Sequence, residues 1–254
     1  MPPVLRLLAK RLGTSLIVLI GVSLLIFAIA RVIPGDPARI ALGPNATAAA
    51  IAALRERLHL DDPFVLQYGY FLADLARGDL GISLYTNRPV TRDIADYLPA
   101  TLELVIVAGI MMVALGLPLG VLSARYRGSW IDHSVRTVTL LGVSAPSFVW
   151  AVILMLVFAF FIPLFPIAGR ISDTYAIAPV TGFLLVDTLI AGNVRGFGNA
   201  AWHIVLPAFA LALSGIAQAA RLTRSNMVET YERPYIEMAK SYGFPEKRIA
   251  WRYA

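Results

Sequence analysis

The residues with the most chemical character lie near the C-terminus, between Arg221 and Ala254, where charged and aromatic side chains surround two prolines and a glycine. Pro234 suits the first position of a short helix, Gly243 suits the left-handed position that ends one, and Pro245 can start another. The pattern predicts two short helices joined by a sharp elbow. Such a pair would lie along a membrane surface or dock into a groove on a soluble partner.

No catalytic or metal-binding constellation is present in the sequence. It contains no G-x-x-x-x-G-K-[ST] phosphate loop, no H-E-x-x-H, no G-x-S-x-G and no cysteine, and its histidines are far apart: His59, His133 and His203. We therefore predict that the chain is not an enzyme and binds no metal or cofactor itself. An intramembrane hydrolase assembled from scattered residues is the alternative.

Composition points to the membrane. The 254 residues are 58% hydrophobic and 15% charged, with a mean hydropathy of +0.70. Soluble domains carry about 25% charged residues, so a water-soluble fold is not expected. The sequence predicts an all-α integral membrane protein, a polytopic helical bundle.

Four stretches are long and apolar enough to cross a bilayer, which takes about 20 residues of helix. We place the spans at 12–33, 99–124, 137–162 and 200–222. A signal peptide is the alternative for the first stretch, because Arg6, Lys10 and Arg11 precede it and Ala28-Ile29-Ala30 resembles a cleavage site. Its apolar core is longer than the 7 to 15 residues typical of signal peptides.

Charge fixes an expected orientation. With the N-terminus in the cytoplasm, the segments 1–11, 125–136 and 221–254 hold 13 Lys/Arg against 5 Asp/Glu, whereas the segments on the other side hold 9 against 11. This is the positive-inside pattern. The net charge of +6 therefore needs no nucleic acid to explain it. A multi-pass protein of the cell inner membrane, in contact with lipid, is predicted.

Two segments fall on the outer side, 34–98 and 163–199. The first contains an expected short helix at 48–58 and a second beginning at Pro63, capped by the preceding aspartate and ending near Arg77. In the second, the piece Tyr175 to Val186 is too short to span, so an interfacial or pore-lining excursion is expected. The Asn45-Ala46-Thr47 sequon is interpreted as chance.

The elbow resembles the EAA loop of ABC importer permeases. Glu237 to Gly243 fits E-x-A-x-x-x-G, and Tyr235 to Phe244 resembles the oligopeptide family's Y-I-x-x-A-x-x-x-G-L. Further resemblances to the dipeptide/oligopeptide (and nickel) permease family follow in the same order along the chain: Ser23–Phe27, Ile33–Pro37, Gly78–Ser83, Pro99–Leu104, Arg127–Asp132, Ala145–Phe148 and His203–Ala208.

This resemblance implies a type I importer fold with six spans, four of which are visible before the chain ends in the EAA coupling loop at 223–254. It implies a second homologous permease subunit, two ATPase subunits that bind ATP and Mg²⁺, and a periplasmic solute-binding protein. The residues implied in coupling to the ATPase are Tyr235, Glu237, Ala239, Lys240, Gly243 and Arg248. Substrates implied are dipeptides or oligopeptides, with nickel chelates, glutathione and other small solutes left open.

Polar or helix-breaking positions within the spans are candidates for lining a pore: Glu103, Ser144, Ser147, His203 and Gln218. For Glu103 the alternative is a headgroup-level position in water, and for the others it is packing between spans. Two competing functions are a secondary transporter, for which Gly128 to Asp132 resembles a G-x-x-x-D carrier loop, and a membrane scaffold or enzyme subunit. A secondary transporter would not explain the elbow, and dependence on an ATPase partner would argue against a scaffold or enzyme subunit.

Overall fold

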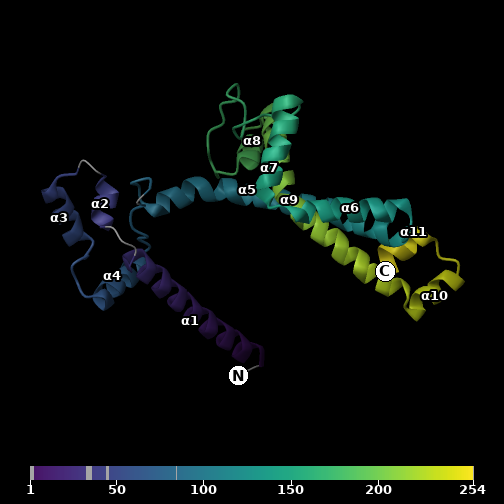
Figure 1. Cartoon of the computed structure of the whole chain (residues 1–254), viewed down its shortest axis with the longest axis horizontal. Coiled ribbons are helices and arrows are strands. Elements are labelled where there is room, and N and C mark those ends of the chain that lie inside the picture. Colours follow the sequence, from purple (N-terminus) through teal and green to yellow (C-terminus); the bar gives the residue numbers. More distant parts are fainter. Residues whose placement is uncertain (1–2, 33–35, 44–45, 84, 254) are drawn as a thin grey trace. The chain divides into compact units, whose positions relative to one another are not determined.

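Long runs without charged residues give this chain its longest helices. The computed structural model describes residues 3–32, 36–43, 46–83 and 85–253. Two sequence features therefore lie partly outside the described residues: residues 33–35 of the family-like motif Ile33–Pro37, and Asn45 of the sequon. The chain divides into two compact units, Met1–Ala95 and Asp96–Ala254. Three helices are long and apolar enough to cross a membrane, and a bent helix pair raises the number to four among the described residues (Figure 1).

The first unit is built around helix α1 (Pro3–Val32), whose apolar section Val4–Ile29 is one of the candidate spans. Three short helices follow, α2 (Pro37–Leu42), α3 (Ala48–Arg57) and α4 (Phe64–Ala76). An aromatic cluster joins α1 to α4, because the ring of Phe27 lies 5.4 to 5.5 Å from the rings of Phe64, Tyr68 and Phe71. The hydroxyl groups of Ser23 and Tyr68 share a hydrogen bond of 2.8 Å.

The expected helices of this region are confirmed, but the expected aspartate cap of α4 is wrong. Pro63 itself occupies the cap position, and no side chain caps the helix. The side chain of Asp62 instead lies 3.1 Å from Nδ1 of His59. The carbonyl of Pro63 accepts from the N–H groups of Leu66 and Gln67, so the first turn is stabilised by the backbone.

The second unit holds most of the membrane-spanning length. Helix α5 (Val90–Arg125) begins in the first unit, and helix α9 (Val194–Tyr231) supplies the other continuous candidate span. Both helices extend beyond the expected spans 99–124 and 200–222. They pack largely through small residues, because Ala108, Ala208 and Ala212 are buried between them together with Ile216. Backbones can approach closely where such residues meet.

Glycines set the closeness of this approach. A Cβ atom placed on Gly120 of α5 would lie 2.5 Å from Cβ of Thr223 and 2.7 Å from the carbonyl oxygen of Ala220 on α9. A Cβ on Gly116 would lie 2.8 Å from Cβ of Ala219. No larger side chain fits at either position without moving the helices.

The expected third span, 137–162, is not one continuous helix. Helix α6 (Trp130–Ser144) ends before Pro146, and α7 (Ser147–Met155) continues into a π-helical turn, η1 (Leu156–Phe161), at an angle of 105° to α6. Proline disfavours helical geometry in the residue before it, and Ala145 is accordingly extended. Figure 1 shows α6 beside α9 and α7 turning away from the direction of α6.

After η1, the chain runs without helix to α8 (Leu184–Ile190) and then enters α9. The piece Tyr175 to Val186 is thus an irregular segment that leads into a short helix. The indole nitrogen of Trp202 on α9 donates to the carbonyl of Leu164, and its ring stacks on Phe165 at 4.4 Å. These contacts pack the start of the irregular segment, residues 162–183, against α9.

The chain ends in α10 (Pro234–Ser241), α11 (Glu246–Arg248) and the π-helical turn η2 (Ile249–Tyr253). The predicted elbow of two short helices is confirmed. Pro245 precedes the second helix as its cap rather than occupying the first helical position.

Candidate functional site

The elbow owes its shape to a glycine and three buried apolar side chains. Gly243 adopts φ +76°, its N–H donates to the carbonyl of Lys240, and the next N–H, of Phe244, donates to Ala239. This pair of bonds is the Schellman motif that a left-handed residue permits at a helix end. Ile236, Ala239 and Ile249 are buried together, so α10 and the turn η2 fold against one another.

The other predicted coupling residues point outward. Tyr235, Glu237, Lys240 and Arg248 are all exposed, whereas Ala239 belongs to the buried cluster. The ammonium group of Lys240 lies 5.6 Å from the ring centre of Tyr231, and the guanidinium of Arg248 lies 5.8 Å from that of Phe244. The elbow is therefore a packed unit whose surface carries an acidic side chain, basic side chains and an aromatic ring.

A buried ion pair joins α6 to α9. Nε and Nη2 of Arg224 on α9 donate to the two carboxylate oxygens of Asp132 on α6, at 2.7 and 2.8 Å. The Ser123 hydroxyl and the Gly128 N–H also donate to Asp132, which is almost fully buried. Four donors therefore compensate the desolvation of one carboxylate.

Sequence reasoning placed Asp132 in a family-like loop motif but did not find this ion pair. Ser129 caps α6 and receives the N–H of Asp132, so the S-x-x-D spacing signals the helix start. The partner Arg224 is 92 residues away, and no local pattern identifies it.

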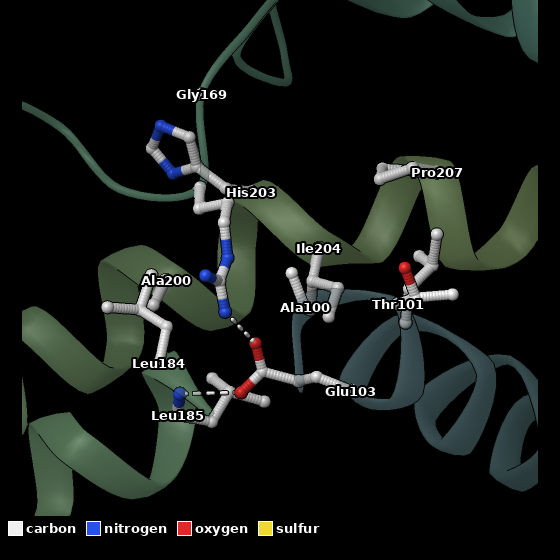
Figure 2. A pocket seen from close by; sticks show the side chains of 12 residues that line it. Ala100, Thr101, Glu103, Gly169, Leu184, Leu185, Ala200, His203, Ile204 and Pro207 are labelled. Carbon is white, nitrogen blue, oxygen red and sulfur yellow. Dashed lines mark hydrogen bonds and ion pairs between the residues drawn. The ribbon is translucent and has the colours of Figure 1, made fainter. Parts of the chain in front are cut away.

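A second site lies around Glu103, in the N-terminal half of α5. A cavity of about 270 Å³ is bounded by α5, α8 and α9 and has mostly apolar walls (Figure 2). The residues that line it are Ala100, Thr101, Glu103, Leu104, Gly169, Arg170, Leu184, Leu185, Ala200, His203, Ile204 and Pro207.

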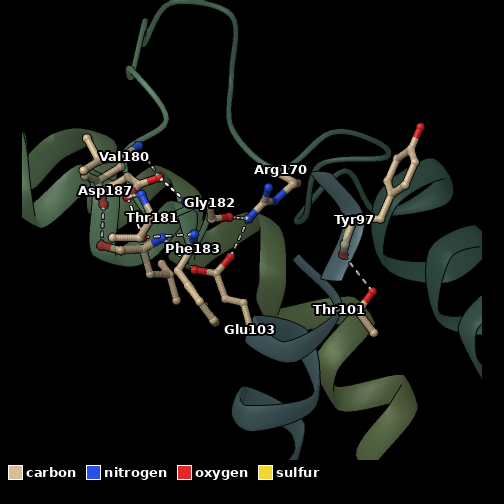
Figure 3. Close-up of polar contacts among 11 residues, drawn as sticks. Tyr97, Thr101, Glu103, Arg170, Val180, Thr181, Gly182, Phe183 and Asp187 are labelled. Atoms are coloured by element: carbon tan, nitrogen blue, oxygen red, sulfur yellow. Dashed lines mark hydrogen bonds and ion pairs between the residues drawn. The ribbon is translucent and has the colours of Figure 1, made fainter. Parts of the chain in front are cut away.

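Glu103 is 6% exposed and both of its carboxylate oxygens are engaged. One accepts from the N–H of Leu185 in the first turn of α8, at 2.7 Å, and the other accepts from Nη2 of Arg170 at 2.9 Å. The same Nη2 donates to the carbonyl of Gly182 at 3.1 Å (Figure 3). Glu103 therefore ties α8 and the irregular segment to α5.

Asp187 on α8 organises the turn before it. Its carboxylate accepts from the Thr181 hydroxyl and from the N–H groups of Val180, Thr181 and Gly182 (Figure 3). These donors, the Thr181 hydroxyl first, hold the pKa of Asp187 below its ordinary value and outweigh the burial that raises it. Gly182 has φ +80°, and a Cβ there would lie 2.9 Å from the Pro99 ring.

Of the predicted pore-lining residues, the structure brings Glu103 and His203 together. His203 is nearly buried and also borders an adjoining cavity of about 280 Å³, which shares Gly169 and Pro207 with the first. Ser144 and Ser147 flank the break between α6 and α7, and Gln218 is exposed on α9, so none of these three borders the Glu103 cavity. Arg170 and Asp187 were missed by sequence reasoning.

Apolar helices joined through small residues, with their buried charges paired, define a polytopic α-helical membrane protein. Among the described residues, no group of three or more His, Asp and Glu side chains is arranged to hold a metal ion.

Comparison with known proteins gives the family. Residues 116–254 match the model of the binding-protein-dependent transport system inner membrane component, and residues 4–105 match that of the N-terminal part of such membrane components. The chain belongs to this family of transport-system permeases. The resemblance to ABC importer permeases is thereby confirmed, and the competing secondary carrier finds no support in these matches.

Similar curated proteins cover nearly the whole chain. It is 38% identical over 250 residues to a probable D,D-dipeptide transport system permease protein of Escherichia coli K12, covering 98% of this chain and 73% of that protein. It is 39% identical over 251 residues to a di/tripeptide transport system permease protein of Pseudomonas aeruginosa UCBPP-PA14, covering 98% and 75%. It is 37% identical over 249 residues to a dipeptide transport system permease protein of Escherichia coli K12, covering 96% and 74%.

Proposed function

We propose that this chain is a permease subunit of an ATP-driven importer and forms part of the path by which dipeptides or short oligopeptides cross the inner membrane. The observation that carries the substrate class is its similarity, along nearly its full length, to permeases named for dipeptides and tripeptides. A periplasmic solute-binding protein delivers the peptide, and a second homologous permease completes the path.

The elbow is the docking site for an ATPase subunit. Its exposed residues Tyr235, Glu237, Lys240 and Arg248 offer charged and aromatic contacts, while the buried cluster beneath them resists deformation. Because the elbow is rigid, a movement of the bound ATPase subunit is transmitted to the helix connected to the elbow. Here that helix is α9, which ends directly before α10. ATP and Mg²⁺ are bound by the partner subunits.

Co-purification tests the docking role. The full chain is isolated from membranes of its source organism under mild detergent conditions, and accompanying proteins are identified by mass spectrometry. We expect an ATPase with a phosphate-binding loop to accompany the wild-type chain and to be lost with Glu237→Lys. Asp173→Lys is the matched control, because Asp173 is also exposed and lies in the irregular segment far from the elbow in sequence. A wild-type chain that purifies without any ATPase would contradict the proposal.

Uptake tests the coupling role. Glu237→Lys and Gly243→Pro should both abolish ATP-dependent peptide uptake while the protein stays in the membrane. The first changes only an exposed side chain, and the second removes the left-handed residue and the N–H that donates to Lys240. Wild-type uptake in both variants would show that the elbow does not couple.

A further inference from the structure

Arg170 has unused hydrogen-bonding capacity at the wall of the Glu103 cavity. A guanidinium carries five N–H donors, and within the described part of the chain Arg170 donates only through Nη2, to Glu103 and to Gly182. No other described residue accepts from its Nε or Nη1, and the side chain is 45% exposed. The donors that remain can hold an anion while the ion pair to Glu103 stays intact.

His203 borders the same cavity and offers an acceptor. Its Nδ1 lies 2.8 Å from the carbonyl oxygen of Asn199, and because a carbonyl only accepts, Nδ1 must carry the hydrogen. In the neutral ring Nε2 is then an acceptor. The cavity thus combines charged donors, one acceptor and apolar walls, which are the features of a site that binds a small, partly apolar molecule.

We propose that this cavity binds the free C-terminal carboxylate of a transported peptide, which accepts hydrogen bonds from Nη1 of Arg170. The peptide's apolar side chains then contact Leu104, Ile204 and Pro207 and extend into the adjoining cavity beyond His203. The inference rests on the proposed peptide transport. It adds a recognition site within the membrane subunit for one end of the peptide.

Glu103 positions Arg170 for this task. Each of its oxygens already accepts one hydrogen bond, from Arg170 and from Leu185, which fixes the carboxylate against the guanidinium. Charge-assisted hydrogen bonds between guanidinium and carboxylate are each worth about 1.5–3 kcal/mol, which corresponds to roughly tenfold or more in affinity. A peptide amide lacks the charge and should lose that factor.

Photolabelling of the full chain in membranes tests the site. The probe is alanyl-photoleucine, a dipeptide with a diazirine side chain, and the competitors are alanyl-leucine and its C-terminal amide. We expect labelling of cavity residues on α5 or α9, and about tenfold or more weaker competition by the amide than by the free acid. Equal competition by both, or absence of label from the cavity residues, would overturn the proposal.

Variants identify the arginine. Arg170→Gln keeps an N–H donor beside Glu103 but removes the positive charge that distinguishes an acid from an amide. The preference for acid over amide should fall toward one in this variant. It should persist in Arg195→Gln, a change of the same chemistry at an exposed position at the start of α9 that does not line the cavity. A preference that persists in Arg170→Gln also overturns the proposal.

The two proposals fail separately. If the chain does not transport peptides, the wild-type complex will show no ATP-dependent peptide uptake. If the chain transports peptides but Arg170 does not bind their carboxylate, uptake will remain and the free acid and the amide will compete equally in labelling.

Discussion

Asp132 and Arg224 show what one buried contact contributes to this molecule. Their side chains come from α6 and α9, and the carboxylate is 2% exposed. Removing one partner of such a pair strands the other charge, whereas exposed ion pairs contribute little. The chain offers an exposed pair for comparison, Arg127 with Glu232 at 3.1 Å, whose side chains are 61% and 69% exposed.

We therefore predict that Asp132→Asn lowers the free energy of unfolding by about 3 kcal/mol, and that Glu232→Gln lowers it by less than about 1 kcal/mol. Thermal unfolding of the purified protein in detergent measures both. Adding Arg224→Gln to Asp132→Asn should cost less than the sum of the single changes, because the stranded charge is removed. Additive losses would contradict a direct pairing.

The carboxylate of Asp187 makes the stability of the turn 180–183 depend on pH. Because its pKa is lowered in the folded protein, it stabilises the turn 180–183 fully at pH values above the ordinary aspartate pKa of about 3.9, and this stabilisation is lost as the pH falls through the lower folded value. Amide hydrogen exchange of 180–183, corrected for intrinsic rates, should stay slow down to about pH 4 and rise below it.

The control for this prediction is an exposed aspartate of the same segment. Asp187→Asn should give fast exchange in 180–183 at every pH, and Asp173→Asn should behave like the wild type. Exchange that depends on pH equally in all three proteins would remove Asp187 as the cause.

Contacts between distant residues were the part of the site that the sequence did not predict. Glu103 stood out as an acid in an apolar run, and His203 as the titratable group of its span. Their shared cavity depends on Arg170, which is 67 residues from Glu103 and lies in an irregular segment. An isolated arginine in such a segment looks like any solvated charge until the packing of α8 against α5 is known.

At the scale of elements, the α5–α9 contact depends on glycines rather than on bulky side chains. Gly120→Ala should destabilise the protein by about 1–3 kcal/mol, because the added methyl meets Thr223 and Ala220 at distances that require the helices to separate. Gly109→Ala on the same helix is the control, since a Cβ there meets nothing within 4 Å. That change should be neutral or stabilising by up to about 1 kcal/mol, through helix propensity.

Thermal unfolding in detergent measures both glycine variants side by side. A Gly120→Ala protein as stable as Gly109→Ala would mean that the two helices are not held at this distance.

The sequence predicted which segments are helical, but it did not predict the angle between consecutive helices. Uncharged runs of about 20 residues demand helices because no backbone polar group can remain unpaired in hydrocarbon. Pro146 marked a weak point in the third run, but a proline can kink a helix slightly or break it. The 105° bend depends on how α6 and α7 pack on α9, and that is tertiary information.

At the scale of the whole molecule, the distribution of charge argues for one orientation in the membrane. The ends of α9 and α5 that lead into the elbow and the loop 125–129 belong to the segments with 13 Lys/Arg against 5 Asp/Glu, whereas the irregular segment before α8 holds one of each. Translocating a short, strongly basic loop is disfavoured, so we expect the basic segments to lie in the cytoplasm. In that orientation the elbow faces the compartment that contains ATP.

Cysteine labelling can test this orientation directly, because the sequence contains no cysteine and each introduced thiol is unique. Asp173 in the irregular segment and Ser241 in the elbow are both exposed, and the expected orientation places them on opposite sides of the membrane. Asp173→Cys and Ser241→Cys therefore each put one thiol on one side. In intact spheroplasts, a membrane-impermeant maleimide should label Asp173→Cys and leave Ser241→Cys unlabelled until the membrane is permeabilised. The reverse pattern would place the elbow outside, where no ATPase could reach it, and the coupling role of Glu237 and Gly243 would fall with the orientation.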